Sequence, residues 1–252
     1  MRILALPAAV ILAFCIYPLL PAAPEWIARA LRALHGRLSR ADSKSDPKTT
    51  VVFLLLVCSI AALLCALHPV CAMLVMAPLF TAASVFPGCA RLKAELDSGT
   101  YARRIPEYEQ KVRAACFSLA DPFIRGLAAP LLLCAAGTPL YLGGALGWGY
   151  AALLALKPQG GWAKRLLDRI TRFAERIFCA LLALCAGVVG RSSLTVRAGS
   201  AAERLVRTLG IAGDKTDTHA PVSGDITQGV FLCCFCCALL CFALCLALIP
   251  VC

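Results

Sequence analysis

Charged side chains are scarce in this sequence. Asp, Glu, Lys and Arg together make up 15% of its 252 residues, whereas an ordinary soluble domain contains about 25%. Apolar residues account for 60% of the chain, and the mean hydropathy is +0.80. This composition excludes a disordered polypeptide and argues strongly against a water-soluble globular protein.

Recognisable catalytic motifs are missing as well. The sequence contains no P-loop, no glycine-rich dinucleotide turn and no histidine pair at metal-binding spacing. Its three histidines, His35, His68 and His219, are spread far apart along the chain. No nucleotide-binding or zinc-hydrolase site is therefore predicted from motif spacing alone.

Long windows without any charge are the main feature that is present. Four of them cover residues 3–24, 49–90, 126–156 and 226–252. A helix of about 20 apolar residues spans a bilayer core of roughly 30 Å, and an isolated apolar segment can satisfy its backbone in lipid only as a helix. We therefore predict an all-α, polytopic integral membrane protein in the cell membrane, with the lipid bilayer as its partner.

The whole chain, residues 1–252, is predicted to form one membrane domain. Its apolar segments are 3–24, 49–90, 126–156, 173–190 and 226–252, and its polar segments are 25–48, 91–125, 157–172 and 191–225. The first segment has the outline of a signal peptide, but we expect a retained span because the rest of the chain is also apolar.

His68-Pro69 interrupts the longest window, 49–90. Proline breaks helix hydrogen bonding, so two spans, or one span followed by a broken or re-entrant segment, both fit this window. His68 is interpreted as a turn residue at the membrane interface; a ligand or proton-carrier role is the alternative.

Residues 25–38 predict a basic amphipathic surface helix. Their apolar side chains recur at helical spacing, whereas the basic residues Arg29, Arg32 and Arg37 lie largely off that face. Such a helix is suited to the lipid surface. The formal net charge of +11 has the same explanation, because basic residues commonly flank membrane spans, and nucleic acid is not an expected partner.

Sixteen cysteines are present, almost all within apolar windows, where a thiol behaves as a small apolar group. We expect mostly free thiols. Cys233, Cys237, Cys241 and Cys245 step by four residues along one predicted helix ridge. A thiophilic metal could use such a ridge, but packing alone accounts for it, and no metal site is expected.

Several short blocks occur in an order and spacing that resemble one family. The blocks are Trp26-Ile27-Ala28-Arg29, Arg113-Ala114 followed by Gly126-Leu127-Ala128-Ala129-Pro130-Leu131, Ala136-Gly137-Thr138-Pro139-Leu140, Arg165 to Asp168, Leu209-Gly210-Ile211 and Gly224-Asp225-Ile226. Across most of its length the chain resembles the CobD/CbiB membrane proteins of cobalamin biosynthesis, which are adenosylcobinamide-phosphate synthases.

The resemblance implies a function and a cofactor requirement. Family members attach aminopropanol or its phosphate to adenosylcobyric acid, an amide-forming ligation that uses ATP and Mg²⁺, so corrinoid intermediates are implied as partners. Asp121, Asp168 and Asp225 are the only acids at matching positions and are the candidate catalytic residues. Other polar family positions are apolar here, for example at Phe117 and Ala120.

Loss of the polar groups predicts a change of activity. An apolar scaffold survives substitution when size and patterning are kept, but catalysis needs charges placed for the transition state. We therefore expect a CobD/CbiB-like fold with impaired or lost catalysis. A non-catalytic membrane scaffold, or a protein that binds a corrinoid or lipid, is the alternative. A small transporter is a third hypothesis, supported only by the glycine-rich stretch 137–149.

Overall fold

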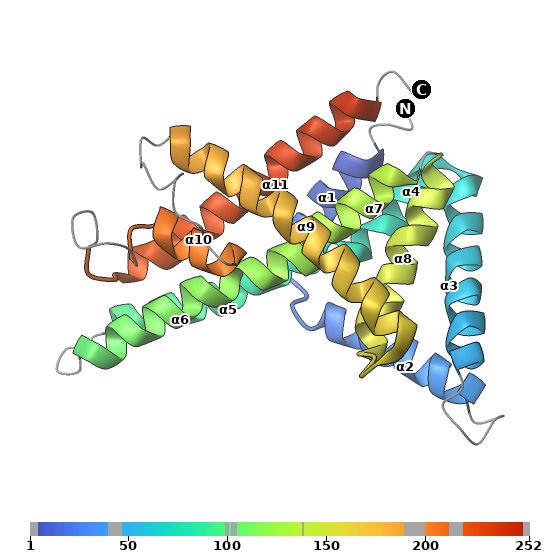
Figure 1. The fold of residues 1–252 in the computed structure, drawn as a ribbon, viewed down its shortest axis with the longest axis horizontal. Coiled ribbons are helices and arrows are strands. Elements are labelled where there is room, and N and C mark those ends of the chain that lie inside the picture. Colours follow the sequence, from blue (N-terminus) through green and yellow to red (C-terminus); the bar gives the residue numbers. More distant parts are fainter. Residues whose placement is uncertain are drawn as a thin grey trace.

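The computed structural model describes residues 5–39, 47–98, 101, 105–137, 139–188, 200–211 and 219–248. Every regular element in these ranges is a helix (Figure 1), which confirms the all-α fold class. The α-helices are α1 (Ala5–Ile16), α2 (Ala23–Ser39), α3 (Pro47–Leu67), α4 (Pro69–Met76), α5 (Phe86–Asp97), α6 (Ile105–Phe123), α7 (Ala129–Ala136), α8 (Leu140–Leu156), α9 (Gly161–Val188), α10 (Ala201–Thr208) and α11 (Ser223–Leu248).

Three shorter elements connect these helices. Two are 3₁₀ turns, η1 (Ala77–Leu79) and η2 (Thr81–Val85), and the third is a π-helical turn, η3 (Ile124–Ala128). The π turn joins α6 to α7 without a break, so that Ile105–Ala136 forms one rod. This rod runs through the middle of the molecule, where α9 crosses it, and it contacts both α9 and α11 (Figure 1).

Three segments are long and apolar enough to cross a membrane: α3, the Ile105–Ala136 rod and α11. A fourth crossing is available if the bent pair Pro69–Leu79 and Thr81–Asp97, which meet at 43°, acts as one broken span. The apolar helices α1 and α8 are shorter, at 12 and 17 residues. The predicted multi-pass helical organisation thus has three to four candidate spans in the described chain.

The break at His68-Pro69 lies where the sequence predicts it. Helix α3 ends at Leu67, and α4 begins at Pro69, where the absent backbone N–H of proline costs no helical hydrogen bond. The exposed His68 caps α4, because its Nδ1 accepts the N–H of Val70 at 3.2 Å. His68 is therefore a turn residue, as the sequence favours.

Helices α3 and α8 pack side by side with opposite chain directions (Figure 1). The buried residues of α3, namely Phe53, Val57, Ala61 and Cys65, recur every four positions and form one ridge. Its opposite face is exposed and apolar, with Leu55, Ile60 and Leu63 at 50–65% accessible. An exposed apolar face of this kind is what a lipid-contacting helix requires.

Helix α2 lies across one end of the α3–α8 pair. This is the end where α3 begins and α8 ends (Figure 1). It has one strongly apolar face and exposed arginines, as predicted for a surface helix. Leu31 packs with Phe53 of α3 and with Ala152 and Ala155 of α8 in a small core of their own. The basic amphipathic helix is therefore anchored to two apolar helices at their charged ends.

Candidate functional site

The three acids matched to the synthase family lie in different environments. Asp121 near the end of α6 is exposed, and its Oδ1 accepts from Arg125 Nε at 2.7 Å one helical turn away. Asp168 on α9 is also exposed. Asp225, at the start of α11, is only 2% accessible. They share no ligand cage, since no group of three His, Cys, Asp or Glu side chains suited to a metal occurs among the described residues.

Asp225 has a structural role that explains its burial. Its carboxylate accepts the backbone N–H of Val222 at 2.8 Å and lies 3.0 Å from Nε2 of His219. A buried carboxylate is retained when such hydrogen bonds replace water. The contacts tie the segment before α11 to its first turn and leave the carboxylate poorly placed to hold a metal.

ATP and Mg²⁺ therefore do not fit the acids that the resemblance selects. Magnesium bound to nucleotide phosphates needs one or more carboxylates directed into an open site. Asp121 is paired with Arg125, and the carboxylate of Asp225 is engaged by His219 and the Val222 N–H. The exposed Asp168 belongs to no group of three potential metal ligands in the described ranges. No reaction step through a magnesium–nucleotide complex can be built from these groups.

The cysteine ridge of α11 packs against neighbouring helices. Cys233 and Cys237 are buried, whereas Cys241 and Cys245 are partly exposed. Off the ridge, Cys236 Sγ lies 3.6 Å from Cys185 Sγ of α9. In the described part of the chain every cysteine is a free thiol, which confirms that prediction, and the thiols act there as small apolar packing groups.

The glycine-rich stretch 137–149 permits close helix packing. A methyl group built on Gly144 would lie 2.5 Å from Cys65 Sγ of α3, and one built on Gly147 would lie 2.5 Å from a methyl carbon of Leu79. Small residues at such positions let helices approach closely. Packing thus accounts for the feature on which the transporter hypothesis depends.

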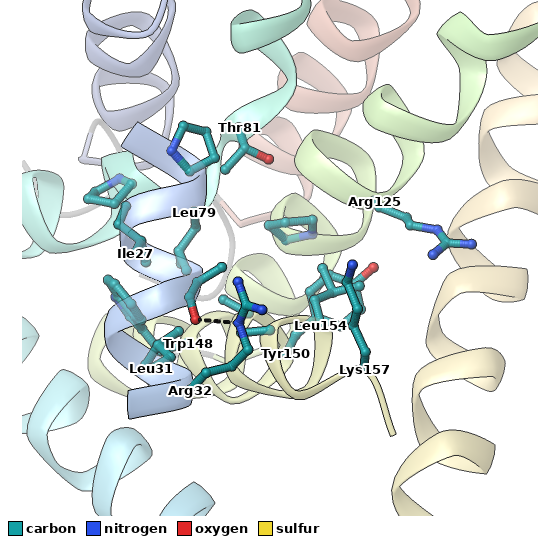
Figure 2. A pocket seen from close by; sticks show the side chains of 16 residues that line it. Ile27, Leu31, Arg32, Leu79, Thr81, Arg125, Trp148, Tyr150, Leu154 and Lys157 are labelled. Atoms are coloured by element: carbon teal, nitrogen blue, oxygen red, sulfur yellow. Dashed lines mark hydrogen bonds between the residues drawn. The ribbon is translucent and has the colours of Figure 1, made fainter. Parts of the chain in front are cut away.

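A pocket of about 190 Å³, here named the inner pocket, lies between α2, η1, α7 and α8. Most of its wall is apolar, and Figure 2 shows Ile27 and Leu31 of α2 and Trp148 and Leu154 of α8 among the side chains that line it. Trp148 is held in place because its Nε1 donates to the carbonyl of Val75 at 2.8 Å.

The charged residues lining the inner pocket are all basic. They are Arg32 of α2, Arg125 of η3 and Lys157 at the end of α8. Arg125 is paired with Asp121 and points away from the other side chains in Figure 2. Arg32 and Lys157 are exposed and form no ion pair with any residue that the structure describes. Within the described ranges, two cations at the edge of an apolar pocket thus have no anionic partner.

A second cavity of about 540 Å³, the outer cavity, lies where the ends of α2, α3, α8 and α9 meet. It is lined by polar and apolar residues, including His35, Thr50 and Trp162, and it shares Arg32 and Lys157 with the inner pocket. These two cations therefore stand at the junction of an apolar pocket and a wider, more polar cavity.

The backbone of Lys157 is unusual. It has φ 47° and ψ 59°, and it is the only non-glycine residue with positive φ in the described ranges. The left-handed conformation costs an L-residue roughly 1–2 kcal/mol, and glycine or asparagine is the common choice at a helix C-terminus. Pro158 follows directly and disfavours the right-handed helical conformation at residue 157.

Two buried polar atoms in these cavities lack hydrogen bonds of good geometry. Tyr150, which lines the inner pocket, is 2% accessible, and its hydroxyl has only a weak contact with Thr171, with Arg125 and Asp121 as the charged groups near it. His35, which lines the outer cavity, has a buried and unpartnered Nε2 and packs edge-on against Phe53. Such atoms are rare in proteins and call for a partner.

Comparison of the chain with protein-family models, with curated proteins and with solved structures gave no significant match. The site is therefore defined by geometry alone. Sequence reasoning noted Arg32 only as a residue of the surface helix and did not select Lys157 or Tyr150. The one local signal for Lys157 was its position between an apolar segment and Pro158, where a helix must end.

Proposed function

We propose that this chain is a non-catalytic, multi-pass protein of the cell membrane that binds an amphiphile in the inner pocket. One observation carries the proposal: an apolar pocket opens beside two unpaired cations and the surface helix α2. Apolar walls with a few convergent polar groups are typical of small-molecule sites. An amphiphile would bury its apolar part there and keep its polar group near the interface.

Trp148 provides a direct test because it lines the inner pocket. With Trp26 and Trp162 replaced by Phe, Trp148 is the sole tryptophan. An amphiphile with a brominated alkyl chain, added in an uncharged detergent, should quench Trp148 fluorescence with a saturating dependence on concentration. Ala151→Leu, which fills part of the pocket, should abolish the saturable component.

Two results would contradict the proposal. One is quenching that rises linearly with the brominated amphiphile, as expected from detergent contact alone. The other is saturable quenching that Ala151→Leu leaves unchanged. Leu55→Ile, on the exposed face of α3, is the matched control and should not alter quenching.

A corrinoid is the second candidate ligand, in a CobD/CbiB-like role with impaired or lost catalysis. Two sequence blocks that resemble the family supply residues to the inner pocket: Ile27 and Ala28 from the first, and Pro130 from the second. The test is to incubate the purified protein with ATP, Mg²⁺, adenosylcobyric acid and aminopropanol phosphate. Amide product would overturn the non-catalytic assignment, whereas retention of the corrinoid without product would support this candidate.

A further inference from the structure

We propose that the amphiphile carries a phosphate group, and that Arg32 and Lys157 bind this group at the junction of the inner pocket and the outer cavity. The inference rests on the proposed function and adds the chemistry of the headgroup. The phosphate belongs to an anionic membrane lipid, whose acyl chain enters the inner pocket.

The charge arrangement is the first reason. Both cavities are lined by Arg32 and Lys157, and neither lining contains an Asp or Glu among the residues that the structure describes. Arg32 uses its Nε for the carbonyl of Ala28 within its own helix, at 3.2 Å (Figure 2), which leaves its terminal guanidinium nitrogens for a ligand. Guanidinium and ammonium groups together are the usual donors to phosphate oxygens.

The weakly partnered hydroxyl of Tyr150 is the second reason. Tyr150 lines the same pocket, is 2% accessible, and has only the weak contact with Thr171 as a hydrogen-bonding partner. A phenol O–H can donate to a phosphate oxygen. Burial of this group with so weak a partner is costly, and a phosphate oxygen within the inner pocket would supply a stronger acceptor.

The location relative to the bilayer is the third reason. The outer cavity is lined by the ends of α2, α3, α8 and α9, and α2 crosses the α3–α8 pair at this end (Figure 1). Lys48 near the start of α3 belongs to the same end. Lipid phosphates lie at this depth, just outside the hydrocarbon. The mixed lining of the outer cavity suits the remainder of a polar headgroup, and His35 Nε2 offers a further hydrogen bond there.

The test compares a lipid that carries a phosphoglycerol headgroup with one that carries a hydroxyl group at the same position. Saturable quenching of Trp148 is measured with brominated phosphatidylglycerol and with brominated diacylglycerol of the same chains. We expect phosphatidylglycerol to bind at least about tenfold more tightly, because charge-assisted hydrogen bonds are strong. Inorganic phosphate alone should neither bind nor displace the lipid, since it cannot use the apolar pocket.

Variants assign the preference to residues. Arg32→Gln and Lys157→Asn should each reduce the preference for phosphatidylglycerol about tenfold and leave diacylglycerol binding unchanged. Asparagine tolerates the left-handed conformation of residue 157, so this variant keeps the backbone. Tyr150→Phe should weaken phosphatidylglycerol binding by a smaller factor. Arg37→Gln removes a cation from α2 outside the pocket lining and should have no effect.

The outcomes separate the two proposals. Equal binding of both lipids, with no response to Arg32→Gln, would overturn the phosphate assignment while the amphiphile proposal stands. Failure of both lipids to quench saturably would overturn the proposed function itself. Displacement of phosphatidylglycerol by inorganic phosphate would show that the site recognises a soluble anion and would overturn the lipid assignment.

Discussion

At the scale of single residues, Asp225 illustrates how a buried acid can be structural. Its carboxylate accepts the N–H of Val222 and contacts His219 at the start of α11. Asp225→Ala should lower the free energy of unfolding by about 1–3 kcal/mol, because the contacts that the buried carboxylate makes with the Val222 N–H and His219 are lost. Thermal unfolding in detergent measures this change.

The control is Asp168→Ala. Asp168 is exposed on α9, and surface substitutions usually change stability by less than about 0.5 kcal/mol. Equal losses for the two variants would contradict a special role for the contacts of Asp225.

A substitution at Lys157 is predicted to increase stability, whereas Asp225→Ala is predicted to decrease it. Its left-handed backbone costs an L-residue roughly 1–2 kcal/mol, and glycine avoids most of this cost. Lys157→Gly should therefore raise the unfolding temperature while it weakens binding of an anionic lipid. Lys164→Gly, in the first part of helix α9, should lower stability by about 1 kcal/mol. If Lys157→Gly also lowered stability, the side chain would have a structural role beyond ligand binding.

At the scale of elements, the contact between α3 and α8 depends on small residues. A carbon atom added at Gly144 meets Cys65 Sγ at 2.5 Å, so the two helices must move apart or the thiol must turn. Overpacking of this kind typically costs about 1–3 kcal/mol. Gly144→Ala should therefore destabilise the protein and lower its unfolding temperature. Thermal unfolding in detergent, followed by the fluorescence of Trp148, measures this change.

Gly36→Ala is the matched control for this contact. Gly36 lies within α2, and no atom approaches a carbon added there within 4 Å. Alanine is favoured over glycine in a helix interior by about 0.5–1 kcal/mol, so this variant should be neutral or stabilising. A stabilising Gly144→Ala would mean that α3 and α8 are not in close contact.

The sequence predicted most elements, because charge-free windows and a proline break are local signals. Pro69 located the end of α3, and residues 25–38 predicted the amphipathic α2. The predicted polar segment 157–172 and apolar segment 173–190 meet within a single helix, since α9 continues from Gly161 to Val188. A long helix can keep one apolar face while its charge density changes, and a count of charges along the sequence does not detect this continuity.

The site could not be predicted in the same way. Arg32 and Lys157 are far apart in sequence and meet the same two cavities only because α2 crosses the end of α8. Tyr150 lies within an apolar run, and nothing in the neighbouring sequence indicates which hydrogen-bond partners its hydroxyl will have. Family resemblance directed attention to acids instead, and the acids that it selected have local structural partners or face solvent.

At the scale of the whole molecule, the exposed apolar face of α3 predicts contact with lipid. Leu55 lies in that face at 61% accessible, and a lysine near the centre of a span costs roughly 3 kcal/mol for insertion. Leu55→Lys should therefore reduce the fraction of protein recovered in the membrane pellet after alkaline extraction. Leu55→Ala should remain in the pellet, and equal extraction of both variants would show that this face does not meet hydrocarbon.

Helix α2 is both a wall of the inner pocket and the element suited to the membrane surface. Any ligand that enters sideways from one leaflet has to pass this helix, so exchange requires α2 to lift. Lifting separates its arginines from anionic headgroups, which becomes harder as the surface charge of the leaflet rises. The residence time of the ligand would thus lengthen in more acidic membranes and shorten with added salt, even if the pocket itself did not change.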